Sequence, residues 1–263
     1  MHNVDFLITT FMRPDSLTKL VESIAKYYPN ANTYIGDQNS KKDRAFYENL
    51  QLRTGLPFTV IKLPYDCGLS RARNYLVQNT PSDYKLILDD DFIFTEETDL
   101  YKFITLIEQD GVGVVAGAVR TKGTIVHYEY RLLKRGDTLY YSSDKDKWKK
   151  HKNITYKQTG CVLNFALYRK EVFADVLWDR DLKVCEHLEF MWRLNQTQWK
   201  ILYTPEVVTD HSQERNGQYK TMRKRPRFRY ISFEKMGITR VKYVHNGQTV
   251  EMKDGKIISY RSK

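Results

Sequence analysis

Strand-like and helix-like segments alternate through the first hundred residues of this chain. The apolar runs rich in β-branched residues are 4–11, 32–37, 57–64 and 84–94. The segments with helical spacing of apolar residues are 13–29, 41–53, 66–80 and 97–109. Such alternation predicts βαβ units and therefore an α/β fold, with a mainly parallel, Rossmann-like sheet flanked by helices.

The stretch LILDDDFIF places three consecutive carboxylates, Asp89–Asp91, directly after an apolar run. Adjacent carboxylates repel each other, and desolvating them costs several kcal/mol unless a cation is present. Thr9, Thr10 and Asp37 also fall at predicted strand ends. Because ligands bind at the carboxyl ends of strands in such sheets, the sequence predicts a metal-binding site there. The alternative is a hydrated turn before a helix.

The second half of the sequence has a different pattern. Alternating aromatic residues between 120 and 160 predict two or three antiparallel strands. Asn246–Gly247 and Asp254–Gly255 are strong hairpin signals, so we expect a three-stranded meander over 240–260. This pattern divides the chain into a main domain, 1–215, and a C-terminal extension, 216–263.

The charge of the chain is concentrated at its C-terminal end. The net charge is +11, and residues 213–263 carry fourteen Lys or Arg against four Asp or Glu. This asymmetry suggests an anionic partner such as a membrane surface, a nucleic acid or an acidic polymer, unless the basic residues form a solvated face. The three cysteines are too widely spaced for a disulfide framework, and no apolar run reaches the ~20 residues that span a bilayer. We therefore expect a cytoplasmic protein.

Six segments of the sequence resemble a known family and occur in the family's order over residues 4–212. They are TTFMRPDSLTKLVESIAKYYP, GLSRARNYLV, LILDDDFIF, TGCVLNFALYRKEVF, WDRDLKVCEHLEF and VVTDHS. The family is that of the inverting glycosyltransferases with the GT-A fold, family 2. The sequence is most similar to the ganglioside and Sda-type β-1,4-N-acetylgalactosaminyltransferases. The resemblance implies transfer of a sugar, an N-acetylhexosamine, from a UDP-sugar to a hydroxyl group of a glycan or lipid-linked acceptor.

The resemblance also implies a divalent metal, Mn²⁺ or Mg²⁺. Negative charge grows on the departing diphosphate, and a cation can neutralise it. In such enzymes Asp91 would contact the metal, and Asp89 would contact the metal or the nucleotide ribose. His211 in VVTDHS matches a histidine that ligates the metal or the diphosphate. Oxygen ligands suit both cations, and a histidine favours Mn²⁺.

Further residues are expected to bind the donor nucleotide. Asp37 resembles the aspartate that accepts a hydrogen bond from uracil or ribose. Arg71 and Arg73 in SRARN lie early in a predicted helix, and arginine is well suited to clamp a diphosphate. The complete predicted donor-binding set is Thr9, Thr10, Arg13, Asp37, Arg71, Asp89 and Asp90.

An inverting transfer needs a base that deprotonates the acceptor hydroxyl. Many family-2 enzymes have Glu-Asp-x-Glu where this chain has CEHLEF, so His187 stands at the position of the aspartate. A neutral histidine has a suitable pKa, whereas a glutamate would need a raised one. The choice of base stays open between His187 and Glu189, with Glu186 as a third candidate.

Two other functions fit parts of the sequence. A sugar-nucleotide nucleotidyltransferase would need an N-terminal Gly-rich loop, which TTFMRPD lacks. A nucleic-acid-binding module could use the basic extension, but the acidic strand ends would repel phosphate in the absence of metal. We therefore expect no nucleic-acid partner.

The segment 215–233 interleaves Arg and Lys with aromatic residues. In one role it contacts an anionic membrane peripherally, because basic residues bind the headgroups and aromatic residues settle at the interface. In the other role it covers the donor, and its Arg and Lys hold the diphosphate. The aromatic residues concerned are Tyr219, Phe228, Tyr230 and Phe233.

Overall fold

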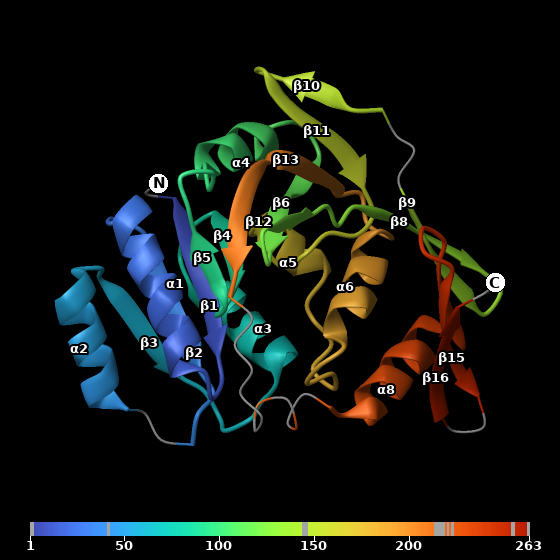
Figure 1. Ribbon diagram of the computed structural model, residues 1–263, viewed down its shortest axis with the longest axis horizontal. Helices are drawn as coiled ribbons and strands as arrows, with labels where there is room; N and C mark the ends of the chain where they lie inside the picture. The colour runs from blue at the N-terminus through green and yellow to red at the C-terminus, as the bar shows by residue number, and fades with distance from the viewer. Residues whose placement is uncertain are drawn as a thin grey trace.

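The computed structural model describes residues 3–40, 43–143, 147–212, 219, 221, 224–253 and 256–261. A large sheet with helices on both faces forms the body, and a smaller sheet lies beside it at the C-terminal end of the chain (Figure 1). The predicted α/β class is confirmed. The large sheet is mixed, because a parallel part built from the first four strands continues into antiparallel pairings.

The strands of the large sheet follow the order β10-β11-β13-β6-β12-β4-β1-β2-β3, with β5 paired to β13 and β7 paired to β6. Their bounds are β1 Val4–Thr10, β2 Asn32–Asp37, β3 Phe58–Lys62, β4 Tyr84–Asp89, β5 Phe92–Phe94, β6 Val112–Thr121, β7 Thr124–Val126, β10 Lys149–His151, β11 Ile154–Thr159, β12 Ala166–Arg169 and β13 Lys200–His211. The helices are α1 Pro14–Tyr27, α2 Arg44–Thr54, α3 Leu69–Asn79, α4 Leu100–Ile107, α5 Val172–Asp175, α6 Glu186–Leu194 and α8 Pro226–Met236. Within the described ranges, no helix is long and apolar enough to cross a membrane.

The strand directions bring several predicted site residues to one edge of the sheet. β1 runs parallel to β2 and β4, and Thr10 pairs with Asp37 while Thr9 pairs with Asp89. β12 runs antiparallel to both β4 and β6, and β13 is parallel to β6. β13 therefore has the same direction as β4, and its last residue, His211, reaches the edge where β4 ends.

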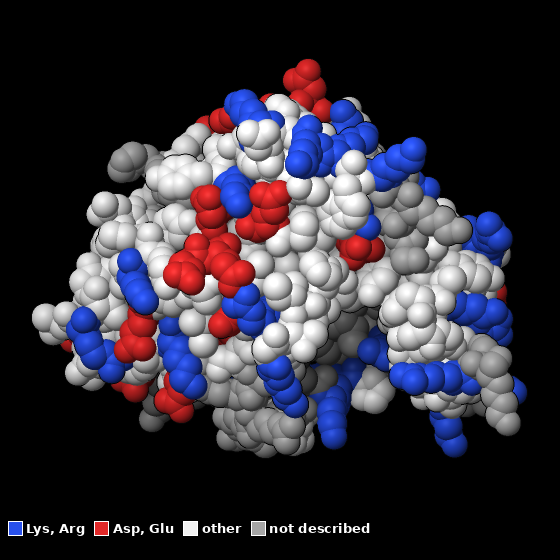
Figure 2. Space-filling view, turned by 45° about the horizontal axis from the view of Figure 1, so that its top comes forward, with Lys and Arg blue, Asp and Glu red and all other residues white. Residues whose placement is uncertain are grey.

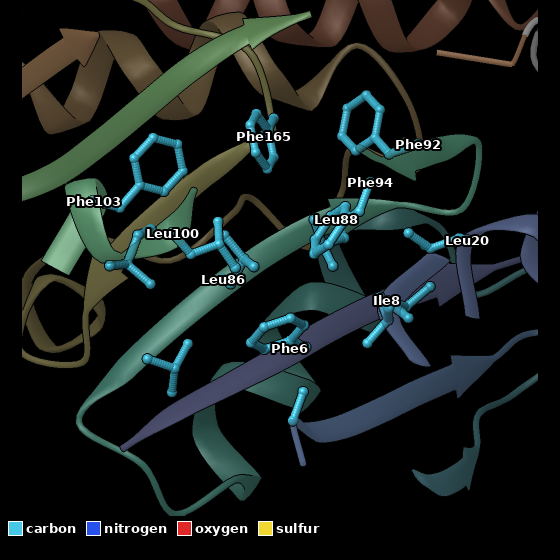
Figure 3. Packing of buried hydrophobic residues seen from close by; sticks show 14 of the residues in the cluster. Phe6, Ile8, Leu20, Leu86, Leu88, Phe92, Phe94, Leu100, Phe103 and Phe165 are labelled. Atoms are coloured by element: carbon cyan, nitrogen blue, oxygen red, sulfur yellow. The ribbon is translucent and has the colours of Figure 1, made fainter. Parts of the chain in front are cut away.

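Both faces of the large sheet are apolar and covered by helices. Phe6, Leu86 and Leu88 belong to the core cluster under α1, α2 and α4 (Figure 3). The alternate residues Leu7 and Ile87 belong to the cluster under α3, α5, α6 and α8. This alternation follows from the twofold period of a strand, and each fully buried side chain of this kind contributes ~1.5–3 kcal/mol. Packing on both faces fixes the strand ends that carry the polar residues.

The turn into α3 requires a glycine. Gly68 has a φ of +92°, and a Cβ added there would lie 2.5 Å from the Cα of Lys183. The close approach is fastened by two hydrogen bonds: the Leu69 amide donates to the Lys183 carbonyl at 2.9 Å, and the Ser70 hydroxyl donates to the Leu182 carbonyl at 2.6 Å. The start of α3 thus packs directly against the segment that leads into α6.

The small sheet has the order β16-β15-β14-β9-β8. Its strands are β8 Tyr130–Arg135, β9 Thr138–Ser143, β14 Arg240–Tyr243, β15 Gln248–Lys253 and β16 Lys256–Arg261. The predicted meander is confirmed, because β14, β15 and β16 pair antiparallel in sequence order. β14 also pairs with β9, so the middle of the chain contributes to this sheet. The predicted Asp254–Gly255 turn and the division after residue 215 lie outside the described residues.

Charged side chains are unevenly distributed over the surface. Figure 2 shows one face, on which Lys and Arg side chains occupy the side of the small sheet, while a group of Asp and Glu lies nearer the middle. This arrangement agrees with the excess of basic residues after residue 212.

Candidate active site

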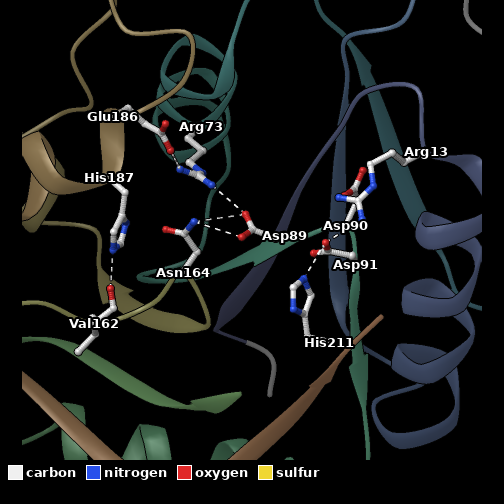
Figure 4. Close-up of polar contacts among 10 residues, drawn as sticks. All are labelled: Arg13, Arg73, Asp89, Asp90, Asp91, Val162, Asn164, Glu186, His187 and His211. Carbon is white, nitrogen blue, oxygen red and sulfur yellow. Dashed lines mark hydrogen bonds and ion pairs between the residues drawn. The ribbon is translucent and has the colours of Figure 1, made fainter. Parts of the chain in front are cut away.

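The three carboxylates at the end of β4 point in different directions, and each contacts a cationic side chain (Figure 4). Asp89 is the last residue of β4, and Asp90 and Asp91 form the connection to β5. Asp89 pairs with Arg73, whereas Asp90 and Asp91 share Arg13, so these cations reduce the mutual repulsion of the triplet.

Asp91 lies beside His211 although 120 residues separate them. The pairing of β13 with β5 sets His211 opposite Phe92, and His211 Nε2 donates to Asp91 Oδ2 at 2.9 Å. Arg13 Nη2 donates to the same carboxylate oxygen at 2.7 Å. Burial alone would raise the pKa of Asp91, but the hydrogen bonds from His211 and Arg13 outweigh it and lower the pKa. The same hydrogen bond to Asp91 raises the pKa of His211.

Asp90 is buried beneath the site, with 4% of its surface exposed. Its carboxylate accepts from Arg13 Nη1 at 2.9 Å and from the Thr10 hydroxyl at 2.8 Å. Burial raises the pKa of Asp90 to about 7, although Arg13 opposes the rise. Asp90 therefore holds Arg13 and Thr10 in place.

Arg73 links three elements around Asp89. Its guanidinium is 1% exposed and donates to Asp89 Oδ1 at 2.8 Å and to Glu186 Oε1 at 2.6 Å. Asn164 Nδ2 donates to Asp89 Oδ2 at 3.2 Å. The Asp89 side chain is 34% exposed, so it combines a fixed orientation with access to a ligand.

Two residues next to this cluster have left-handed backbone conformations. Met12 has a φ of 58° and precedes Arg13, and Cys185 has a φ of 63° and precedes Glu186. Neither is a glycine, so each position carries local strain. Strain of this kind concentrates at functional sites. Here the two strained positions precede Arg13, which pairs with Asp90 and Asp91, and Glu186, which pairs with Arg73.

The three candidate bases of the CEHLEF segment have different partners. Glu186 faces Arg73. Glu189 is 3% exposed and paired with Arg193 one turn along the same helix. The Nε2–H of His187 donates to the Val162 carbonyl, as Figure 4 shows, and Nδ1 has no hydrogen-bond partner among the described residues.

The remaining predicted donor residues lie on both sides of the strand edge. The buried hydroxyl of Thr9 has no partner in the described part of the chain. Asp37 is 1% exposed, accepts from Asn39 and lines a cavity of about 210 Å³ with Thr10. Arg71 lies on the exposed side of α3, and its Nε donates to a backbone carbonyl, that of Arg180. Of the two arginines in SRARN, only Arg73 is brought to the acidic triplet.

A second, small cavity of about 40 Å³ adjoins the site, and two residues of its wall, Phe11 and Gln38, were not predicted from the sequence. Phe11 and Gln38 line it together with Tyr219 and Arg225 from the C-terminal extension. The Tyr219 ring lies 4.7 Å from the guanidinium carbon of Arg13. Phe11 follows β1 directly, just as Gln38 follows β2, so their positions at strand ends were the signal that could have indicated them.

The residues present fit a metal held jointly with a substrate. Asp91 and His211 supply a carboxylate oxygen and an imidazole nitrogen side by side. The described residues contain no group of three or more His, Cys, Asp or Glu that could hold a metal alone. Mg²⁺ and similar ions are commonly bound through one or two protein ligands plus substrate phosphates. The donor set is therefore suited to a hard cation that completes its coordination with a diphosphate.

Curated proteins with similar sequences are sugar transferases. This chain is 28% identical over 221 residues to beta-1,4 N-acetylgalactosaminyltransferase 1 of Rattus norvegicus, covering 80% of this chain and 40% of the relative. It is 27% identical over 189 residues to beta-1,4 N-acetylgalactosaminyltransferase 2 of Mus musculus, covering 69% of this chain and 34% of the relative. The chain thus spans well under half the length of these relatives.

Solved structures show the same fold. GalNAc-T7 with UDP, GalNAc and Mn²⁺ superposes with a TM-score of 0.61 at 17% identity, covering 80% of this chain and 43% of that one. S. aureus TarS 1–349 with UDP-GlcNAc gives a TM-score of 0.60 at 15% identity, covering 83% and 61%. The GT-A fold predicted from the sequence is confirmed.

The match to a sequence-family model identifies the family of the protein. The model of glycosyl transferase family 2 matches residues 5–177, which include β1 to β4 and the acidic triplet. The match favours sugar transfer over the nucleotidyltransferase and nucleic-acid-binding alternatives. The chain belongs to glycosyl transferase family 2.

Proposed function

We propose that this chain transfers an N-acetylhexosamine from a UDP-sugar to a hydroxyl group of a glycan or lipid-linked acceptor, with inversion at the anomeric carbon. The observation that carries the proposal is the Asp91–His211 pair beside Arg13 at the strand edge. The relatives named as N-acetylgalactosaminyltransferases and the structural neighbour with UDP and Mn²⁺ support it.

The proposed donor site spans the acidic edge and the cavity beside it. Asp91 and His211 would hold Mn²⁺ or Mg²⁺ together with the diphosphate, and the bound cation would neutralise the charge of the leaving UDP. Arg13 is positioned to move from Asp91 to a phosphate oxygen, because arginine binds both groups with the same geometry. Phe11, Tyr219 and Gln38 offer stacking surfaces and an amide for the nucleobase.

Among the three candidate bases, the geometry supports His187. The Val162 carbonyl can only accept a hydrogen bond, so Nε2 carries the proton and Nδ1 of the neutral ring has a free lone pair. Burial lowers the pKa of His187, which keeps the ring neutral at pH 7. Glu186 and Glu189 each form an ion pair with an arginine, Glu186 with Arg73 and Glu189 with Arg193.

The proposed step is a single displacement. His187 Nδ1 takes the proton of the acceptor hydroxyl while its oxygen forms the new bond to the anomeric carbon, and the bond from that carbon to the UDP oxygen breaks. Arg73 and Asn164 hold Asp89 at the donor edge throughout.

A screen of sugar nucleotides tests this function. The purified protein is incubated with UDP- and GDP-sugars in Mn²⁺ or in EDTA, and both nucleotide binding and release of the nucleoside diphosphate are measured. We expect binding and slow hydrolysis of a UDP-N-acetylhexosamine in Mn²⁺ and neither in EDTA. Failure to bind or hydrolyse any sugar nucleotide would overturn the proposal. Full turnover in EDTA would contradict the proposed role of the metal ion.

A further inference from the structure

The small sheet has two unlike faces. Its inner face carries Leu139, Tyr141 and Val241, which belong to the core cluster shared with α6 and α8. Successive residues of a strand point to opposite faces, so the residues that alternate with these form the outer face. On that face Leu133 is 45% and Tyr260 is 44% exposed, so the outer face is open to solvent.

The strand pairings arrange the outer-face residues in rows that cross all five strands. One row is Leu133, Tyr140, Lys242, Thr249 and Tyr260, and the next is Arg135, Thr138, Arg240, Glu251 and Ile258. By the same alternation Arg131, Lys253 and Lys256 belong to this face. Among the described residues of these strands, the outer face therefore carries six Lys or Arg and one carboxylate.

The cations of the outer face are only partly neutralised. The single carboxylate, Glu251, forms an ion pair with Arg240 and accepts a hydrogen bond from the Tyr260 hydroxyl at 3.0 Å. Arg135 and Lys242 instead lie 5.9 and 5.8 Å from the centre of the Tyr140 ring, and neither forms an ion pair within the described part of the chain. Figure 2 likewise shows Lys and Arg side chains on the side of the small sheet. An excess of unpaired cations on one face favours an anionic partner.

The apolar side chains of this face favour a lipid surface among the anionic partners. Leu133 and Ile258 are both exposed, and they lie on β8 and β16, the strands at the two edges of the sheet, with basic residues between them. At a bilayer interface, basic residues bind the headgroups while tyrosine and aliphatic side chains settle at the boundary with the acyl chains.

Two other occupants fit this face less well. A single-stranded nucleic acid stacks its bases on open aromatic rings, whereas the Tyr140 ring has two cations within 6 Å of its centre. A second copy of the chain, docked through the same face, would bring like charges together.

We propose that the outer face of the small sheet docks on an anionic bilayer surface. This surface is built from β8 and β9 together with β14, β15 and β16. It therefore differs from the segment 215–233, whose Phe228 and Phe233 are buried. The inference goes beyond the proposed function and stands independently of it, because the strands of the small sheet carry none of the residues proposed for catalysis or donor binding.

Two double variants with the same change of charge test this face. Arg135→Gln with Lys242→Gln removes two positive charges from it. The matched control, Lys149→Gln with Lys150→Gln, removes two positive charges from exposed positions of β10 in the large sheet. Cosedimentation with phosphatidylcholine vesicles, prepared with and without phosphatidylserine, measures binding at low salt.

A third double variant tests the apolar contribution. Leu133→Ser with Ile258→Ser removes exposed apolar side chains and leaves the net charge unchanged. Fluorescence anisotropy of a labelled random oligonucleotide, measured with all four proteins at the same salt, tests the nucleic-acid alternative. Circular dichroism checks that each variant is folded.

We expect the wild type to bind vesicles that contain phosphatidylserine, not vesicles of phosphatidylcholine alone, and to dissociate as the salt concentration rises. The Arg135 and Lys242 variant should bind at least tenfold more weakly, and the Leu133 and Ile258 variant at least threefold more weakly. The Lys149 and Lys150 variant should stay within twofold of the wild type.

Three results would overturn the inference. The first is a folded wild type that does not bind phosphatidylserine vesicles at low salt. The second is an equal loss of vesicle binding in the two charge variants, which would mean that net charge matters and this face does not. The third is oligonucleotide binding that depends on Arg135 and Lys242 while vesicle binding does not, which would assign the face to nucleic acid.

Discussion

His211 Nε2 and Asp91 Oδ2 are 2.9 Å apart although 120 residues separate them in the sequence. β13 carries His211 to this place by pairing with β5, which follows Asp91 at once. The Ser212 amide also donates to the Asp91 carbonyl at 2.8 Å, so backbone and side chains fix the pair together. Under the proposed function, this pair would supply a partial coordination site for the metal.

Metal affinity should therefore depend on the nucleotide. With only two protein ligands, Mn²⁺ alone should bind weakly, and UDP should tighten it at least tenfold by adding diphosphate oxygens. Calorimetric titration of Mn²⁺ in the presence and absence of UDP measures this difference. Equal affinity in both titrations would show that the protein binds the metal without the diphosphate.

Asp91→Asn should remove at least nine-tenths of transfer activity, a loss of at least ~1.4 kcal/mol of transition-state stabilisation. The fold should be retained, because Asp91 faces the site edge. Asp210→Asn is the matched control, since Asp210 is the neighbour of His211 and pairs with Arg120 at 3.0 Å. Activity assays and circular dichroism of both variants check the prediction, and a loss of similar size in the control would argue against metal binding by Asp91.

Arg73→Ala should destabilise the protein by ~3–5 kcal/mol, because it leaves Asp89 and Glu186 without their shared cation at a buried position. Arg71→Ala, two residues away on the exposed side of α3, should change the free energy of unfolding by no more than ~0.5 kcal/mol. Urea denaturation of the two variants measures the contrast. Similar values would mean that the Arg73 ion pairs contribute little to stability.

The pH dependence of transfer should identify the base. Burial lowers the pKa of His187 from its ordinary value of 6.5, so the unprotonated ring predominates at pH 7 and transfer should fall as the pH drops through that lowered pKa. His187→Gln should lose transfer by ~10²–10⁴-fold while still binding UDP. Glu189→Gln should keep both the activity and the acidic limb of the profile. A normal profile in His187→Gln would reject this base.

The strand-end residues were predictable because their pattern is local. An apolar run that meets Asp89–Asp91, and another that meets Asp37, indicate strand ends directly, and parallel strands align their ends at one edge. The α/β class and the meander were predictable for the same reason. His211 was indicated only through the family resemblance, because its position depends on strand pairings far apart in the sequence.

The orientation of helical side chains was harder to predict. The buried face of α3 includes Ser70, Arg73, Asn74 and Val77, which are spaced at i, i+3, i+4 and i+7. That spacing leaves Arg71 on the opposite side of the helix. Arg71 is the arginine of this helix in the predicted donor-binding set, whereas Arg73 is the one that lies beside Asp89. The helical period distinguishes the two once the apolar neighbours are assigned to the core.

The C-terminal extension was the least predictable part, because its aromatic residues pack over long distances in the sequence. Phe228 and Phe233 are each 3% exposed and pack into the body of the protein, so they are not available to a membrane interface. Deleting residues 216–263 would expose this core, and truncation would therefore not separate a membrane role from a donor role. Single substitutions at Tyr219 and Arg225 avoid this problem.

Tyr219→Ala and Arg225→Ala should each weaken UDP binding about tenfold, equivalent to ~1.4 kcal/mol, the size of one partly buried cation–π or charge-assisted contact. The Tyr219 ring lies over the Arg13 guanidinium. Arg225 donates to Asp66 at 2.8 Å, and both residues line the cavity that Phe11 also lines. Arg227→Ala is the control, and calorimetry with UDP is the measurement.

Sedimentation with phosphatidylserine vesicles at low salt tests the membrane-binding role in parallel, because each basic residue near an anionic surface contributes ~1 kcal/mol. If UDP binding is unchanged in both variants and the wild type binds vesicles, the C-terminal extension contacts a membrane and does not bind the donor.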